Sequence, residues 1–198
     1  MTSLGALAVA YLVGAIPVGY LVGRAFGVGD IRRHGSGNIG TTNVLRTLGR
    51  LPAILTLAGD VAKGAAAVAL AAAWSRGDPR VVAASAVAVV AGNCWSVFLK
   101  FRGGKGGATG LGAFFWLVPW ATLPAALVWV GIAATFRYVS LASVMAAACV
   151  PLGALALGYP GSSVVACLVA AGIVVARHRD NIARLTAGTE RRVGQSSR

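Results

Sequence analysis

Long apolar runs alternate with short polar segments along this chain, and most of the runs have a length that suits a membrane-spanning α-helix. A span needs about 20 residues at a rise of about 1.5 Å each. Such runs cover residues 4–23, 51–74, 81–99, 141–157 and 164–176. The pattern therefore predicts an all-α, polytopic membrane protein, and we expect residues 1–198 to form a single domain.

One further apolar run, residues 108–136, is uncharged but contains Pro119 and Pro124. It is too long for one ordinary span and too short for two full ones. Basic residues follow the first run but do not precede it, so the positive-inside rule places the N-terminus outside and the glycine-rich loops and arginine-rich tail in the cytoplasm. An even number of crossings must then lie between residues 108 and 176. We therefore predict two short helices with a turn near Pro119, and a bundle of seven transmembrane helices.

The composition agrees with a membrane protein and limits its partners. Of the 198 residues 57% are hydrophobic and 12% charged, and the mean hydropathy is +0.76. The net charge of +13 could indicate nucleic acid, but the aromatic residues lie mainly in apolar runs and not among the basic ones. We expect membrane lipid and phosphorylated small molecules as partners and no nucleic acid, although the positive-inside rule alone explains most arginines. The three cysteines lack metal-ligand spacing and are expected to be buried apolar residues.

The first polar cluster is HGSGNIGTTNVLR, residues 34–46. Its glycines allow backbone amides to turn toward a ligand, Ser36 can donate or accept, and the amides of Asn38 and Asn43 can donate to a phosphoryl or carbonyl oxygen. Arg46 offers a guanidinium that matches phosphate. The alternative is a turn in which Thr41 or Thr42 caps a short amphipathic helix that runs to Leu48.

The second cluster, GGKGGATG at residues 103–110, resembles a phosphate cradle. It is not the loop of nucleotide hydrolases, because Lys105 follows Gly104 directly and Gly106 comes next. A glycine-rich turn into a helix that begins near Ala108 would direct amides and a positive helix end at an anion. A basic hairpin beside the membrane is the alternative.

The third cluster, RHRDNIARLTAGTE, follows the last apolar run. His178, Asn181 and Leu185 are three and four residues apart and share a helix face. Arg184 lies one turn beyond Asn181, and Glu190 follows an expected helix end at Gly188. Topology puts all three clusters on one side of the membrane.

Two ionisable residues, Asp60 and Lys63, lie inside the second apolar run. Their spacing of three allows an ion pair, which could support the site from below or be purely structural. The chain offers no serine–histidine–acid pattern and no metal-ligand set, so neither a metal nor another cofactor is expected. A reaction here would depend on positioning and on charge stabilisation of phosphorylated substrates.

These three clusters closely resemble the motifs of the bacterial acyl-phosphate:glycerol-3-phosphate acyltransferase family. The matching segments are SGNIGTTNVLR, GGKGGAT and HRDNIARLTAGTE, at residues 36–46, 103–109 and 178–190. The resemblance implies a seven-helix enzyme of the bacterial inner membrane with its site at the cytoplasmic face. It would transfer a fatty acyl group from acyl phosphate to the 1-hydroxyl of glycerol 3-phosphate, giving lysophosphatidic acid and phosphate. It also implies a functional link to the enzyme that supplies the acyl phosphate.

The resemblance further implies roles for individual residues. Lys105 and the loop amides would hold one phosphate, and Arg46 the other phosphate or the glycerol backbone. Ser36 and Asn38 would orient the acceptor or polarise the acyl carbonyl, while His178 and Asn181 would bind glycerol 3-phosphate and the reacting centre. The implied catalytic residues are Ser36, Arg46, Lys105, His178 and Asn181. The remaining residues implied in substrate or phosphate binding are Gly37, Gly40, Thr42, Asn43, Gly103, Gly104, Gly106, Ser143, Arg184, Gly188 and Glu190, of which Glu190 would fix the tail.

The chain departs from the family pattern at three positions: Thr41 replaces an expected alanine, Gly107 an expected valine, and Asn93 an expected histidine. Sequence leaves open whether His178 or a substrate phosphate is the base. The main alternative function is transport of phosphate or an organic phosphate, although the chain shows no repeat of the kind common in carriers.

Overall fold

The computed structural model describes residues 2–194, and over that range the chain forms helices and loops without a β-strand. The helices are α1 Ser3–Ala15, α2 Val18–Ala25, η1 Ile31–Arg33, α3 Thr41–Leu48, α4 Arg50–Trp74, α5 Pro79–Cys94, η2 Val97–Leu99, α6 Gly107–Leu117, α7 Pro119–Phe136, α8 Val139–Ala156, α9 Gly161–Arg177 and α10 Arg179–Thr186. The all-α prediction is therefore confirmed.

Five helical segments in the described range are long and apolar enough to cross a membrane, and the count is six if the bent pair α9–α10 is one span. The five cover Ser3–Ala25, Arg50–Trp74, Pro79–Leu99, Pro119–Phe136 and Val139–Ala156. Helix α6 is apolar but has 11 residues. A multi-pass membrane protein follows from these segments, whereas the count of seven stays a prediction.

Prolines divide two of the predicted runs. The first run was expected to be one helix, but it breaks into α1 and α2 at Ile16 and Pro17. Proline lacks an N–H and displaces the preceding residue from helical geometry, which explains this break. The break predicted near Pro119 is confirmed, because α6 ends at Leu117 and Pro119 is the first residue of α7, where its missing N–H is tolerated. Pro124 lies inside α7 without ending it.

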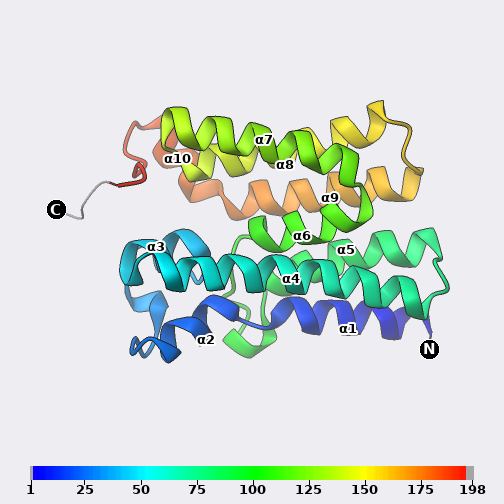
Figure 1. The fold of residues 1–198 in the computed structure, drawn as a ribbon, viewed down its shortest axis with the longest axis horizontal. Helices are drawn as coiled ribbons and strands as arrows, with labels where there is room; N and C mark the ends of the chain where they lie inside the picture. The colour runs from blue at the N-terminus through cyan, green and yellow to red at the C-terminus, as the bar shows by residue number, and fades with distance from the viewer. Residues whose placement is uncertain (1, 195–198) are drawn as a thin grey trace.

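The helices form two groups, which meet where α5 packs against α9 and α6 against α7. Figure 1 shows α1, α4 and α5 together on one side, α7, α8 and α9 on the other, and α6 between them. Glycines on α1 and α4 allow close backbone approach to α5 and α6. A Cβ on Gly14 of α1 would lie 2.1 Å from the Val89 carbonyl oxygen, and one on Gly64 of α4 would lie 2.1 Å from that of Thr109. These glycines let α1 pack closely on α5, and α4 on α6.

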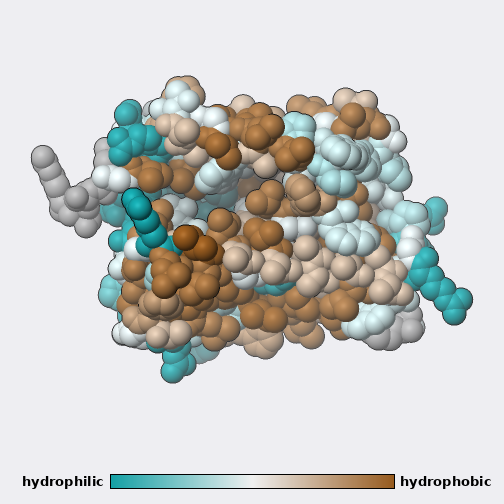
Figure 2. All heavy atoms as spheres, viewed as in Figure 1, coloured by the Kyte–Doolittle hydropathy of each residue, from teal (hydrophilic) through white to brown (hydrophobic). Residues whose placement is uncertain are grey.

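Polar segments gather at the two ends of the bundle. In Figure 2 brown side chains cover most of the visible face, and teal ones lie mainly at the ends. The start of α1 and the turn between α4 and α5 lie at one end, and α2, α3 and α10 lie at the other (Figure 1). Each of the three motif segments contributes to the second end.

Candidate active site

The buried side chain of Asn43 holds the loop of the first motif together. Its side chain is 2% exposed, and its Nδ2 donates to the backbone carbonyls of Ile31, His34 and Asn38 at 3.1, 3.1 and 2.7 Å. Its Oδ1 accepts the Ser36 N–H at 2.8 Å. Both ends of this amide are thus bonded to the loop backbone. Asn43 therefore stabilises the loop in this structure, and its predicted role in phosphate binding stays a prediction.

The rest of the first motif forms a turn that leads into α3. Gly35 and Gly37 have φ of +61° and +71°, the left-handed region that favours glycine. Asn38 Oδ1 accepts the Gly40 N–H at 2.8 Å, which leaves its Nδ2 for other partners. Helix α3 ends at Leu48 as predicted, but Gly40 is its N-cap residue, so the expected threonine cap is wrong. Thr42 lies in the first turn of α3, and Ser36 is exposed.

The glycines of the second motif are held tightly from two sides. The Gly104 N–H donates to the Asn93 carbonyl at the end of α5, at 2.8 Å. Arg177 of α9 donates to the carbonyls of Gly103 and Gly104 at 3.4 and 3.2 Å. A Cβ on Gly103 would lie 2.2 Å from the Asn93 carbonyl oxygen. The Gly104 amide is therefore engaged with the Asn93 carbonyl in this structure, and its predicted binding of a phosphate stays a prediction.

Helix α6 begins directly after this segment. Gly106, at φ +81°, is its N-cap residue, and no side chain caps the helix. The first amides of a helix lack internal partners and favour an anion. Lys105 stands immediately before this helix end, and its Nζ donates to Asn181 Oδ1. Burial lowers the pKa of the Lys105 ammonium, and the nearby Glu190 carboxylate partly offsets that effect.

His178 lies where α9 bends by 60° into α10, and it is 5% exposed. Its Nδ1 is 2.8 Å from the Val174 carbonyl oxygen. A carbonyl can only accept, so Nδ1 carries the proton in this contact. In the neutral ring Nε2 is then the unprotonated nitrogen, which is able to accept a proton or a hydrogen bond.

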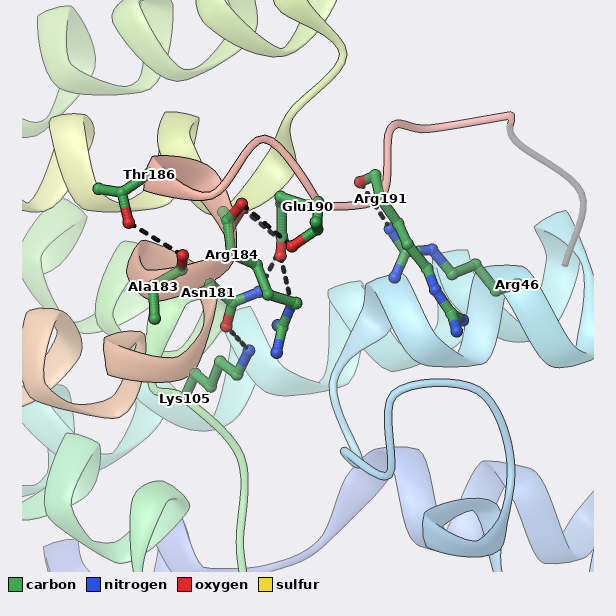
Figure 3. Close-up of polar contacts among 10 residues, drawn as sticks. Arg46, Lys105, Asn181, Ala183, Arg184, Thr186, Glu190 and Arg191 are labelled. Atoms are coloured by element: carbon green, nitrogen blue, oxygen red, sulfur yellow. Dashed lines mark hydrogen bonds and ion pairs between the residues drawn. The ribbon is translucent and has the colours of Figure 1, made fainter.

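A chain of hydrogen bonds joins the second and third motifs (Figure 3). Asn181 accepts from Lys105 and donates through Nδ2 to Glu190 Oε1 at 2.6 Å. The same Oε1 accepts the Ser140 hydroxyl of α8 at 2.7 Å, and Oε2 accepts Arg184 Nε at 2.7 Å. Burial disfavours the Glu190 carboxylate, but these three hydrogen bonds outweigh it and lower its pKa.

The turn at Gly188 directs Glu190 back toward α10. Gly188 has φ +68°, its N–H donates to the Leu185 carbonyl at 3.2 Å, and the Thr189 N–H donates to the Arg184 carbonyl at 2.8 Å. This pattern is a Schellman motif, in which a left-handed glycine ends the helix. The helix end predicted at Gly188 is confirmed, and it explains how residue 190 reaches Asn181.

Arg46 connects the first motif to the tail. Its guanidinium donates to the Arg191 carbonyl at 3.2 Å, and Figure 3 shows it extending from α3 beside the segment that follows Glu190. Lys105 and Arg184 stand on the other side of Glu190 (Figure 3). Cations from three separate segments thus surround a carboxylate. Such an arrangement suits an anionic ligand bearing phosphate.

The structure joins some predicted residues and separates others. Lys105, Asn181, Arg184 and Glu190 are linked directly. Ser143 of α8 instead donates to the Val139 carbonyl at 2.8 Å and accepts from Trp129 of α7 at 3.1 Å, so its binding role stays a prediction.

Sequence reasoning missed three contributors to this region: Ser140, Arg177 and Asn93 as a support of the glycine loop. Arg177 stands beside His178 in the third cluster, and this adjacency was the available signal. Nothing in the sequence signalled Ser140, because it is the turn at Gly188 that brings Glu190 to it from 50 residues away. Within residues 2–194, no group of three or more His, Cys, Asp or Glu side chains could hold a metal ion.

The chain is similar to known proteins over nearly its whole length. The family model described as glycerol-3-phosphate acyltransferase matches residues 4–188. A glycerol-3-phosphate acyltransferase of Geobacter sulfurreducens is 50% identical, covering 93% of this chain and 94% of the relative. That of Rubrobacter xylanophilus is 47% identical, covering 94% and 93%.

Solved structures agree with the sequence relatives. The crystal structure of PlsY, an integral membrane glycerol 3-phosphate acyltransferase, in its glycerol 3-phosphate form has a TM-score of 0.92. It is 40% identical, covering 98% of this chain and 96% of that one. Its lysophosphatidic acid form gives a TM-score of 0.90 at 39% identity over the same shares. With motifs, fold and relatives in agreement, the chain belongs to the glycerol-3-phosphate acyltransferase family.

Proposed function

We propose that this membrane enzyme moves a fatty acyl group from an acyl phosphate to the 1-hydroxyl of glycerol 3-phosphate, giving lysophosphatidic acid and phosphate. Acyl transfer to glycerol 3-phosphate is the activity of its family. The observation that carries the proposal is the linked set Lys105, Asn181 and Glu190 at the polar end of the bundle. The transporter alternative has no support, because the Geobacter and Rubrobacter relatives and PlsY are all acyltransferases.

The reaction needs no nucleophile from the protein. An acyl phosphate is a mixed anhydride, so its carbonyl is already activated for attack. The glycerol 1-hydroxyl oxygen bonds to the acyl carbon, the bond from that carbon to the phosphate oxygen breaks, and phosphate leaves. Lys105 and Arg46 bind the phosphates of the two substrates and stabilise the charge that develops on the departing one.

Two groups could take the proton of the 1-hydroxyl. One is Nε2 of His178, which the contact of Nδ1 with the Val174 carbonyl leaves unprotonated in the neutral ring. The other is an oxygen of a substrate phosphate. A His178→Asn change distinguishes them, because a histidine base gives kcat an acidic limb that this variant lacks, whereas a phosphate base preserves it.

The donor is tested directly with purified protein in detergent or lipid mesophase. We expect palmitoyl phosphate and glycerol 3-phosphate to give lysophosphatidic acid and inorganic phosphate in equal amounts. Palmitoyl coenzyme A should give no product, because the phosphate of the donor is the group that the cluster binds. Product from the coenzyme A ester alone, with none from the acyl phosphate, would contradict the proposed donor.

We also propose seven spans in the bacterial inner membrane, with the N-terminus outside and the site facing the cytoplasm. Seven crossings result if the segment α1–α2, the helices α4 to α8 and the pair α9–α10 each cross once. Between the spans, Arg76 and Arg80 would lie outside. The loops at residues 24–50 and 100–107, which would face the cytoplasm, carry more basic residues.

Single cysteines placed in a cysteine-free background test this orientation. We expect the thiol of Arg76→Cys to react with a membrane-impermeant maleimide in intact cells. The thiol of Arg102→Cys should react only after the membrane is permeabilised. The opposite pattern would reverse the orientation, and equal reaction at both positions in intact cells would contradict a site on one side.

A further inference from the structure

Helix α4 carries an ion pair inside the bundle that the reaction does not use. Lys63 Nζ lies 2.8 Å from Asp60 Oδ1, and the two residues are 7% and 6% exposed. Ionisable residues within a membrane span are costly and are retained where they have a function. A partner one turn away on the same helix offsets part of that cost, but it does not explain why the charges lie there.

The remaining contacts of Lys63 reach two other helices. Its Nζ donates to the Ile16 carbonyl, at the break between α1 and α2, at 2.7 Å. It also donates to Asn93 Oδ1, in the last turn of α5, at 2.9 Å. One ammonium therefore joins α4 to the first span and to the end of α5.

Asn93 extends this network to the glycine loop. Its backbone carbonyl accepts the Gly104 N–H at 2.8 Å, next to Lys105 in the chain. Its side chain underlies the same residue, since a Cβ on Gly104 would lie 2.8 Å from Asn93 Nδ2. The backbone and the side chain of Asn93 thus both contact Gly104 in the loop. The Asn93 side chain in turn accepts a hydrogen bond from Lys63.

We infer that Lys63, acting through Asn93, is a positioning residue for the loop that carries Lys105. This rests on the proposed function, in which Lys105 binds a substrate phosphate. The ammonium fixes the Asn93 side chain, Asn93 fixes the backbone of Gly104, and that backbone sets where the Lys105 side chain begins. Small displacements of a binding group strongly reduce catalysis, so a buried pair one layer below the site affects the reaction.

The alternative is that Lys63 only joins helices and stabilises the bundle. The two roles predict different effects of Asn93→Ala. That variant leaves Lys63 with Asp60 and the Ile16 carbonyl, so no buried charge loses its last partner. A bundle-only role predicts little change in the loop, whereas a positioning role predicts a loop that loosens without loss of fold.

The test measures hydrogen–deuterium exchange of a peptide covering residues 100–107, together with steady-state kinetics. The variants are Asn93→Ala and the double variant Asp60→Leu, Lys63→Met, which removes both charges together. Ser85→Ala is the matched control, since Ser85 is a fully buried polar residue on the same helix that bonds only its own turn, to the Val82 carbonyl at 2.7 Å.

We expect both test variants to exchange the loop about tenfold faster and to lose about tenfold or more in kcat/KM for glycerol 3-phosphate. The control should change neither, and the melting temperature of Asn93→Ala should stay close to that of the wild type. Loop exchange equal to that in the control, in either Asn93→Ala or the double variant, would overturn the inference. The exchange readout needs no activity, so it remains decisive if the proposed reaction fails.

Discussion

Replacing Lys105 with alanine is expected to lower kcat/KM by about a thousandfold while the protein still inserts and folds. The ammonium stands at the uncapped N-terminus of α6 and donates to Asn181. In the proposed reaction, alanine removes the charge that holds a phosphate. Binding of that phosphate is stronger in the transition state, where negative charge moves onto it. The structural loss is small because Lys105 lies in a loop, where alanine breaks no helix hydrogen bond. Steady-state rates with palmitoyl phosphate and glycerol 3-phosphate measure the effect.

The control for this variant is Arg102→Ala. Arg102 is an exposed cation three residues earlier in the same loop, and it tests whether any positive charge there is sufficient. We expect it to change the rate by less than about threefold, as a surface charge screened by solvent does. Near-normal activity of Lys105→Ala in well-folded protein would disprove the phosphate-binding role of this loop.

The fold was predictable where hydrophobicity and proline determine it. Apolar runs revealed the helices because lipid leaves the backbone few alternatives to a helix. The break at Pro119 followed from length and proline together. The break at Pro17 was missed because the surrounding run has an ordinary span length, so nothing in the pattern required an interruption. The presence of a proline alone does not predict a helix break, since Pro124 lies inside α7 without ending it.

The candidate site was predictable as a set of residue types but not as a set of contacts. Glycine, asparagine and cations in three segments indicated an anion site, and the structure links Lys105 to Asn181 and Glu190. Which polar groups remain available for a ligand depends on tertiary contacts. Asn43 and the amide of Gly104 are engaged with the loop backbone and the Asn93 carbonyl in this structure, so their predicted binding of substrate stays a prediction.

Removing the carboxylate of Glu190 is the second change with a large expected effect. In Glu190→Gln an amide replaces an oxygen that now accepts from Asn181, Ser140 or Arg184, so at least one donor loses its acceptor. The negative charge among Lys105, Arg184 and Arg46 also disappears, and repulsion between these cations increases. We expect kcat/KM to fall by about a hundredfold, because Asn181 no longer holds Lys105 in place. The same kinetic assay measures this.

The pH dependence of stability separates the charge of Glu190 from its shape. Hydrogen bonds hold its pKa in the folded protein below the ordinary 4.5, so the carboxylate stabilises the fold above about pH 4.5. That contribution is lost as the pH falls through the lowered pKa. The melting temperature of the wild type should therefore decrease more between pH 6 and pH 3 than that of Glu190→Gln, which has no proton to take up there. Asp180→Asn is the control, because Asp180 is an exposed carboxylate on α10 that pairs with the exposed Arg179 at 3.5 Å. An equal decrease in melting temperature for the wild type and Glu190→Gln between pH 6 and pH 3 would show that the charge of Glu190 does not stabilise the fold. Its link to Lys105 would then depend on side-chain geometry alone.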